Sequence, residues 1–270
     1  MAVFAVPALF CIAARKKAEW AEGNRPCAGI EEEKKSVVHC ILHFCEYAGG
    51  TSGRKIMKYW LPKTMILLLV IYAYICMWHW PIGFTFFTQL SNLYAAVAVL
   101  LQLIAGPGRL KGFKYSAVVS ILVTFVVYLL VLAPIYPGGI LAAYRQDHDA
   151  SLCMHVLVPM MMLSDFCLND RPVQLHRRWL LYALLPPTVW FCMILILGAA
   201  GFRWHGMPAP YPFLNYLAPS GWFGFMPETA GYGSMGIGVA YALVVMLGVF
   251  ALIGFLVLRI ASRPKDSTNR

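Results

Sequence analysis

The stretch that decides the fold is residues 236–260, GIGVAYALVVMLGVFALIGFLVLRI, which carries no charged side chain until Arg259. At about 1.5 Å per residue, a helix of this length crosses the hydrocarbon core of a bilayer, which is about 30 Å thick. Because only helices and closed barrels satisfy their backbone groups in lipid, we expect an all-α, polytopic membrane protein with a six-helix transmembrane bundle. The other five predicted spans are at about 64–80, 86–105, 115–134, 151–168 and 179–200.

Composition supports the same class of protein. The chain has 270 residues, of which 60% are hydrophobic and 13% charged, whereas soluble domains have about 45–50% apolar and about 25% charged residues. Disordered, collagen-like and small disulfide-rich proteins are excluded by these numbers. His39 and His43, one helical turn apart and beside Cys40 and Cys45, permit a zinc interpretation. We prefer a chance cluster, and we predict no metal, nucleotide, flavin or other cofactor.

The basic residues follow the spans in a regular way. The formal net charge is +10, and fourteen of the Lys and Arg residues after residue 53 lie on one predicted side of the membrane. The opposite connections carry only Arg145 and Arg203. By the positive-inside rule, both termini are predicted to be cytoplasmic (N-in/C-in). Residues 57–63 form a short basic lead into the first span, as bacterial inner-membrane proteins often begin, so we expect a bacterial inner (cell) membrane. Topology thus accounts for the charge, and we expect membrane lipids as partners and no nucleic acid; the sequence does not assign an oligomeric state.

The domain organisation predicted from these patterns has four parts. Residues 1–56 are expected to form a poorly ordered cytoplasmic extension, with Met57 as a possible true start. Residues 57–262 are expected to form the membrane domain, and 263–270 a cytoplasmic tail. Within the membrane domain, the outer connection 201–235 is rich in Pro, Gly and aromatic residues, so it is predicted to be an interfacial anchor or a lid over an outward-facing cavity.

Polar residues inside the spans indicate a candidate site. Thr88, Ser91 and Asn92 follow an i, i+3, i+4 spacing and therefore share one helix face. His155 lies at a similar depth in the fourth span, four residues before Pro159, which should kink that helix. Such residues commonly form hydrogen bonds between membrane helices, and this packing role is the alternative to a functional one.

The chemistry that fits these residues is nucleophilic catalysis. A threonine hydroxyl and an imidazole at one level can form an activated nucleophile, with Thr88 attacking a carbonyl and His155 accepting its proton. Ser91 and Asn92 are candidates for pocket lining or oxyanion stabilisation, as are backbone N–H groups near the kink. Asp165, nearer the cytoplasmic end, is expected to pair with Arg171 or Arg177.

Four short motifs follow one another along residues 86–260. They are Phe86–Asn92, Tyr128–Pro134, His155 with Pro159 and Asp165, and Tyr211–Asn215 followed by Gly231–Gly233. In these motifs the chain resembles a family of bacterial six-span membrane proteins. That family in turn resembles the androgen-induced and androgen-dependent intramembrane threonine hydrolases of animals, which act on fatty acid esters of hydroxy fatty acids.

The resemblance implies an intramembrane hydrolase of lipid-like esters, with Thr88 as the nucleophile and His155 as the base. The chain departs from the animal pattern in spacing Thr88 and Asn92 by four residues instead of three, and in having Leu152 where a second histidine is usual. Asn215 stands where the bacterial loop has aspartate. The alternative function is a non-catalytic membrane binder, carrier or structural protein with a polar pocket near the outer face.

Overall fold

A computed structural model describes residues 51–77, 82–134, 136, 138–170, 178–231 and 233–261. Most of the predicted extension 1–56, the histidines considered for zinc and the predicted tail 263–270 lie outside the described residues. The chain divides into two units, Met1–Trp60 and Leu61–Arg270. The described residues of the first unit belong to the first half of a helix, and the second unit contains the helical bundle.

The described residues form helices joined by short connections and one long loop. The helices are α3 (Thr51–Cys76), α4 (Phe87–Ala105), α5 (Lys111–Val127), α6 (Gly139–Tyr144), α7 (Gln146–Leu152), α8 (Val158–Asn169), α9 (Arg178–Ala199) and α10 (Val239–Ala261). A π-helical turn, Tyr128–Leu132, extends α5, and a second one, Cys153–Leu157, joins α7 to α8. Short 3₁₀ turns occupy Ile82–Thr85, Pro212–Leu214 and Pro227–Thr229.

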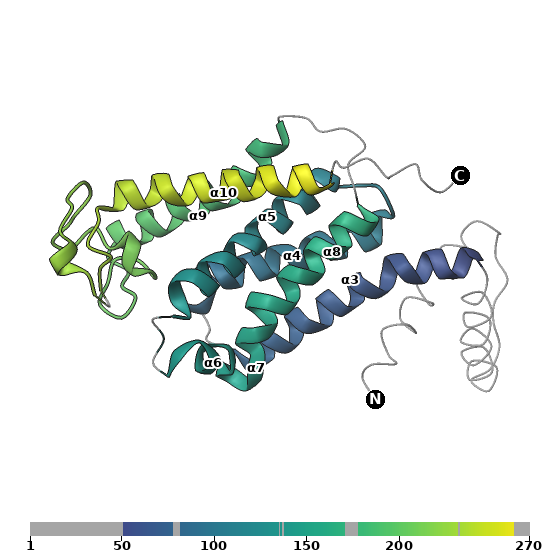
Figure 1. Cartoon of the computed structure of the whole chain (residues 1–270), viewed down its shortest axis with the longest axis horizontal. Helices are drawn as coiled ribbons and strands as arrows, with labels where there is room; N and C mark the ends of the chain where they lie inside the picture. The colour runs from purple at the N-terminus through teal and green to yellow at the C-terminus, as the bar shows by residue number, and fades with distance from the viewer. Residues whose placement is uncertain are drawn as a thin grey trace. The chain divides into compact units, whose positions relative to one another are not determined.

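Helix α5 is the centre of the bundle. It packs against α4, α8, α9 and α10 (Figure 1), and every residue from Lys114 to Thr124 is buried. Two of its hydroxyl groups bond carbonyls of the same helix: Ser120 Oγ donates to the Ser116 carbonyl at 2.9 Å and Thr124 Oγ1 to the Ser120 carbonyl at 3.3 Å. A polar side chain that bonds its own backbone in this way is compatible with a dry helical core.

Within the part of the chain that the structure describes, six helical segments are long and apolar enough to cross a membrane. Large aliphatic side chains face outward around the bundle; examples are Ile75, Ile104, Leu181 and Val244, each with more than two thirds of its surface exposed. Such a surface is unfavourable in water and suits hydrocarbon. The chain is therefore a multi-pass integral membrane protein, and the all-α six-helix bundle predicted from the sequence is confirmed.

The bundle has two chemically different ends. The end at which α4 stops and α5 starts carries Arg109, Lys111 and Lys114, and we call it the basic end. The opposite end carries the long connection between α9 and α10, residues 200–238, and we call it the loop end (Figure 1).

Several boundaries differ from the predicted ones. Helix α3 begins at Thr51, six residues before the predicted start of the membrane domain, and ends at Cys76. The short helix α6 was not predicted, because it follows Gly138, begins at Gly139 and has six residues, too few for a span. Residues 147–149 all have positive φ, 49°, 56° and 63°, so regular helix in the fourth span starts close to the predicted Ser151.

Candidate active site

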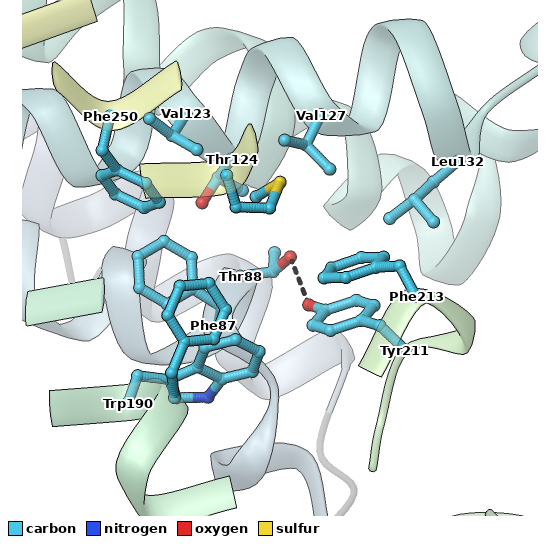
Figure 2. Close-up of a pocket in the computed structure, with 12 residues that line it drawn as sticks. Phe87, Thr88, Val123, Thr124, Val127, Leu132, Trp190, Tyr211, Phe213 and Phe250 are labelled. Atoms are coloured by element: carbon cyan, nitrogen blue, oxygen red, sulfur yellow. Dashed lines mark hydrogen bonds between the residues drawn. The ribbon is translucent and has the colours of Figure 1, made fainter. Parts of the chain in front are cut away.

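A small cavity lies at the loop end between α4, α5, α9, α10 and the long loop. Its volume of about 30 Å³ gives room for about two water molecules. Most of its lining is apolar and aromatic, and its only hydroxyl groups belong to Thr88, Thr124 and Tyr211 (Figure 2). The cavity is therefore a narrow apolar space with a few polar groups at fixed places, the usual composition of a ligand site.

Thr88 and Tyr211 meet across this cavity. Thr88 Oγ1 lies 3.5 Å from the Tyr211 hydroxyl, at the limit of a hydrogen bond (Figure 2). Tyr211 stacks on Phe213, with ring centroids 5.3 Å apart, and packs edge-on against Phe86 at 5.8 Å. Burial raises the pKa of Tyr211 above its ordinary value, and the hydrogen bond from Thr88 opposes this only in part. Tyr211 is therefore a neutral phenol beside Thr88 Oγ1, in a pair in which either hydroxyl is able to donate.

The loop residues that close the cavity are anchored to the segment before α4. Trp204 Nε1 donates to Thr85 Oγ1 at 2.6 Å, and Trp190 Nε1 of α9 donates to the Thr85 carbonyl at 2.9 Å. The backbone of Trp204 also pairs with that of Met207 in both directions. Indole N–H groups that find partners in this way fix the rings, and with them the loop, over the start of α4.

Ser91 and Asn92 lie one turn further along α4, and their donor groups are engaged. Ser91 Oγ donates to the Thr88 carbonyl at 2.9 Å and lies 2.8 Å from Thr124 Oγ1. Asn92 Nδ2 donates to the Thr88 carbonyl at 2.9 Å and to the Met154 carbonyl at 3.4 Å. Asn92 Oδ1 is buried and has no partner among the described residues. Neither residue lines the cavity itself.

His155 lies in the π-helical turn between α7 and α8. Its Nδ1 is 2.7 Å from the Ser151 carbonyl and 3.2 Å from Ser151 Oγ. A carbonyl oxygen only accepts, so Nδ1 carries the proton and the lone pair is on Nε2. The ring stacks on Tyr128 with centroids 3.5 Å apart, and the Tyr128 hydroxyl donates to the Ala143 carbonyl at 2.9 Å. His155 is thus held in the tautomer that a general base needs.

Both partners of this stack lie in π-helical turns. The Val158 N–H donates to the Cys153 carbonyl in one turn, and the Ala133 N–H donates to the Tyr128 carbonyl at 2.8 Å in the other. Pro159 was predicted to kink the helix, because proline lacks the N–H that would donate to the carbonyl one turn earlier. In the structure a π-helical turn lies directly before Val158 and Pro159. Single π-helical turns occur frequently at functional sites.

The structure brings the predicted residues into one region but not all into contact. Asn92 joins α4 to the His155 turn through the Met154 carbonyl, and Thr124 and Tyr128 lie one turn apart on α5. No hydrogen bond joins Thr88 to His155; the hydroxyl partner of Thr88 is Tyr211. Tyr211, which is 123 residues from Thr88, was not among the predicted site residues, although it lies in one of the motifs that carry the family resemblance.

A second polar cluster lies at the basic end. Lys63 Nζ is 2.9 Å from both carboxylate oxygens of Asp165 and 3.1 Å from Asp170 Oδ2, while Lys114 Nζ is 2.7 Å from Asp165 Oδ2. All four side chains are fully buried. Burial also raises the pKa of Asp170 above its ordinary value. The charged partners of Asp165 among the described residues are therefore two lysines, and the expected partners Arg171 and Arg177 lie outside the described residues.

Neither a metal-binding cluster among the described residues nor a related protein adds to the description of the site. The described residues contain no group of three or more His, Cys, Asp or Glu side chains that could hold a metal ion. Comparison with protein-family models, with curated proteins and with solved structures finds no match to this chain.

Proposed function

We propose that this chain is an intramembrane hydrolase of lipid-like esters, in which Thr88 is the nucleophile and His155 the general base. The observation that carries the proposal is the Thr88 hydroxyl, which faces a cavity beside the protonated phenol of Tyr211. A hydroxyl nucleophile needs a place for the carbonyl and a donor for the developing oxyanion. In this proposal Tyr211 supplies that donor, and its hydrogen bond to the oxyanion is stronger in a site with little water, because the dielectric constant there is low.

The proposed reaction has two steps. Thr88 Oγ1 attacks the ester carbonyl while His155 Nε2 takes the hydroxyl proton, and the Tyr211 O–H donates to the resulting oxyanion. Collapse breaks the bond to the alcohol oxygen, which takes the proton from His155, and leaves an acyl group on Thr88. In the second step His155 deprotonates a water molecule that attacks the acyl-threonine, releasing the carboxylic acid and restoring the hydroxyl.

The contacts of His155 support its assigned role. The Ser151 carbonyl holds the proton on Nδ1, which is the task that the third member of a catalytic triad performs. Because Thr88 and His155 do not touch in this conformation, the proposal requires them to approach when substrate binds. Catalytic hydrogen bonds often tighten only in the substrate complex. The cavity, with room for about two water molecules, must also widen to admit an ester.

The test is ester hydrolysis by the full chain in nanodiscs. The substrates are fatty acid esters of hydroxy fatty acids together with simple acyl esters of increasing chain length. Thr88→Val keeps the shape and removes the hydroxyl, and His155→Gln removes the base; Thr188→Val, which removes an exposed hydroxyl on α9 that bonds the Leu184 carbonyl, is the matched control. Loss of turnover in the first two variants alone, with melting unchanged, is the expected result.

The second candidate is a non-catalytic membrane binder, and the observation that favours it is the direct engagement of Thr88 with Tyr211 in place of His155. In that case the polar groups orient a small ligand without covalent chemistry. Absence of turnover above a preparation from an empty vector, or turnover that survives both Thr88→Val and His155→Gln, would favour this candidate.

A further inference from the structure

The long loop between α9 and α10 has a buried half and an exposed half. Residues 204–216 are mostly buried against the bundle, whereas 217–231 and 233–235 are mostly exposed. The exposed half presents large apolar side chains, and we call this set the aromatic rim: Leu217, Trp222, Phe223, Phe225 and Met226. Phe223 and Phe225 expose 71% and 72% of their surfaces. Residues 217–238 contain one charged side chain, that of Glu228.

The rim is fixed to the first turn of α10 by backbone hydrogen bonds. The N–H groups of Val239 and Ala240 donate to the carbonyls of Gly221 and Trp222 at 3.1 and 3.0 Å. These are N–H groups that a helix start leaves without intrahelical partners, and in lipid they need other acceptors. Gly238 permits the close approach, because a Cβ atom there would lie 2.4 Å from the Trp222 carbonyl oxygen.

This attachment sets the depth of the rim. From Val239 to Leu258, the last residue before Arg259, α10 rises about 28 Å at about 1.5 Å per residue, which matches the hydrocarbon thickness of about 30 Å. With Arg259 at the opposite boundary, the first turn of α10 lies at the boundary near the loop end. Trp222 and Phe223, bonded to or next to that turn, lie at the same level.

The rim also continues the outward-facing surface of the bundle. Phe223 contacts the half-exposed ring of Tyr241 on α10, with centroids 6.4 Å apart in an edge-to-face arrangement. Val244 and Val245 follow on the same helix, exposed by 72% and 62%. An aromatic surface that is nearly free of charge and continuous with a lipid-facing helix has the composition of a membrane-interface belt.

We propose that the aromatic rim inserts into the interfacial layer of the bilayer at the loop end, where Phe223 and Phe225 contact phospholipid acyl chains. The occupant of this surface is lipid and not a second protein, because the surface is continuous with the lipid-facing side of α10. This proposal is independent of hydrolase activity. A chain of packed side chains leads from the rim to the cavity. Trp222 of the rim stacks on Tyr216 with ring centroids 5.5 Å apart, and Tyr216 packs on the hydrophobic cluster that contains Tyr211 of the cavity wall.

The test is site-specific photocrosslinking of the full chain in phosphatidylcholine vesicles. Benzoylphenylalanine replaces Phe223 in one variant and Phe225 in a second, so that a folding defect at one position leaves the other as a probe. Glu228, exposed in the same loop, is the polar control, and Phe250, which is 1% exposed, is the buried control. After illumination, intact-mass spectrometry measures adducts that have gained the mass of one phospholipid.

The expected result is a several-fold higher yield of lipid adduct at positions 223 and 225 than at 228, with no lipid adduct at 250. Crosslinks between two copies of the chain at 223 and 225 would overturn the proposal in favour of a dimer interface. A lipid yield at 223 and 225 no higher than at 228 would overturn it in favour of a loop that stands in water.

Discussion

Replacement of Asp165 by asparagine removes the charge that two buried lysines share. Asp165 accepts hydrogen bonds from Lys63 at 2.9 Å and from Lys114 at 2.7 Å, and none of these side chains is exposed. Lys63 keeps Asp170 at 3.1 Å, but Lys114 has no other ion-pair partner among the described residues. Removing one member of a buried ion pair costs about 3–5 kcal/mol, because the remaining charge is left without compensation.

We therefore predict that Asp165→Asn lowers the free energy of unfolding by about 3–5 kcal/mol. The double variant Asp165→Asn/Lys114→Met leaves only the neutral pair of Lys63 and Asp170. It should be more stable than Asp165→Asn alone, with a coupling energy of about 0.5–3 kcal/mol, the range found for residues in contact.

The assay is equilibrium unfolding in dodecyl maltoside with increasing fractions of sodium dodecyl sulfate, followed by circular dichroism. Ser164→Ala is the control on the same helix, because its hydroxyl is exposed and bonds only the Met160 carbonyl. The reasoning is refuted if Asp165→Asn unfolds like Ser164→Ala, or if adding Lys114→Met destabilises the asparagine variant further.

Three further predictions concern packing and the candidate site. Gly254→Ala should cost about 1–3 kcal/mol through overpacking, because its Cβ would lie 2.7 Å from the Tyr115 hydroxyl and 3.2 Å from Ala183; Gly248→Ala on the same helix has open space there and should not destabilise. Tyr211→Phe should lower ester turnover by about 10²- to 10³-fold, the usual loss for one oxyanion donor, and unchanged turnover would contradict its role. Because burial raises the pKa of Tyr211 above its ordinary value, any loss of turnover caused by ionisation of its phenol should be centred above pH 10; a loss centred at or below pH 10 would contradict this.

The bundle could be predicted because lipid imposes a strong constraint on sequence. A span must be about 20 residues long and apolar, and this property is visible in any single segment. The boundary of α3 was missed because Lys63 marked the end of the apolar stretch. In the structure Lys63 lies within the helix, where Asp165 and Asp170 compensate its charge, and a pairing over more than 100 residues leaves no local signal.

For the candidate site, the sequence predicted only which residues are neighbours on the same helix. The i, i+3, i+4 spacing correctly placed Thr88, Ser91 and Asn92 next to one another, because helical geometry alone decides this. Helix periodicity does not determine which faces of different helices meet, so the proximity of Tyr211 to Thr88 was not predicted. Pro159 predicted a distortion of the fourth span. The π-helical turn at Tyr128–Leu132 lies within a regular apolar stretch, so no residue there predicts it.

The most direct test of the central claim is covalent labelling of Thr88. A long-chain alkyl fluorophosphonate reacts with an activated hydroxyl by forming a P–O bond and releasing fluoride, and peptide mass spectrometry then locates the label. Incubation of the full chain in nanodiscs should place the label on Thr88, with labelling abolished by Thr88→Val and strongly slowed by His155→Gln. Failure to label Thr88, or labelling elsewhere that persists in the Thr88→Val variant, would contradict the assignment of Thr88 as a nucleophile.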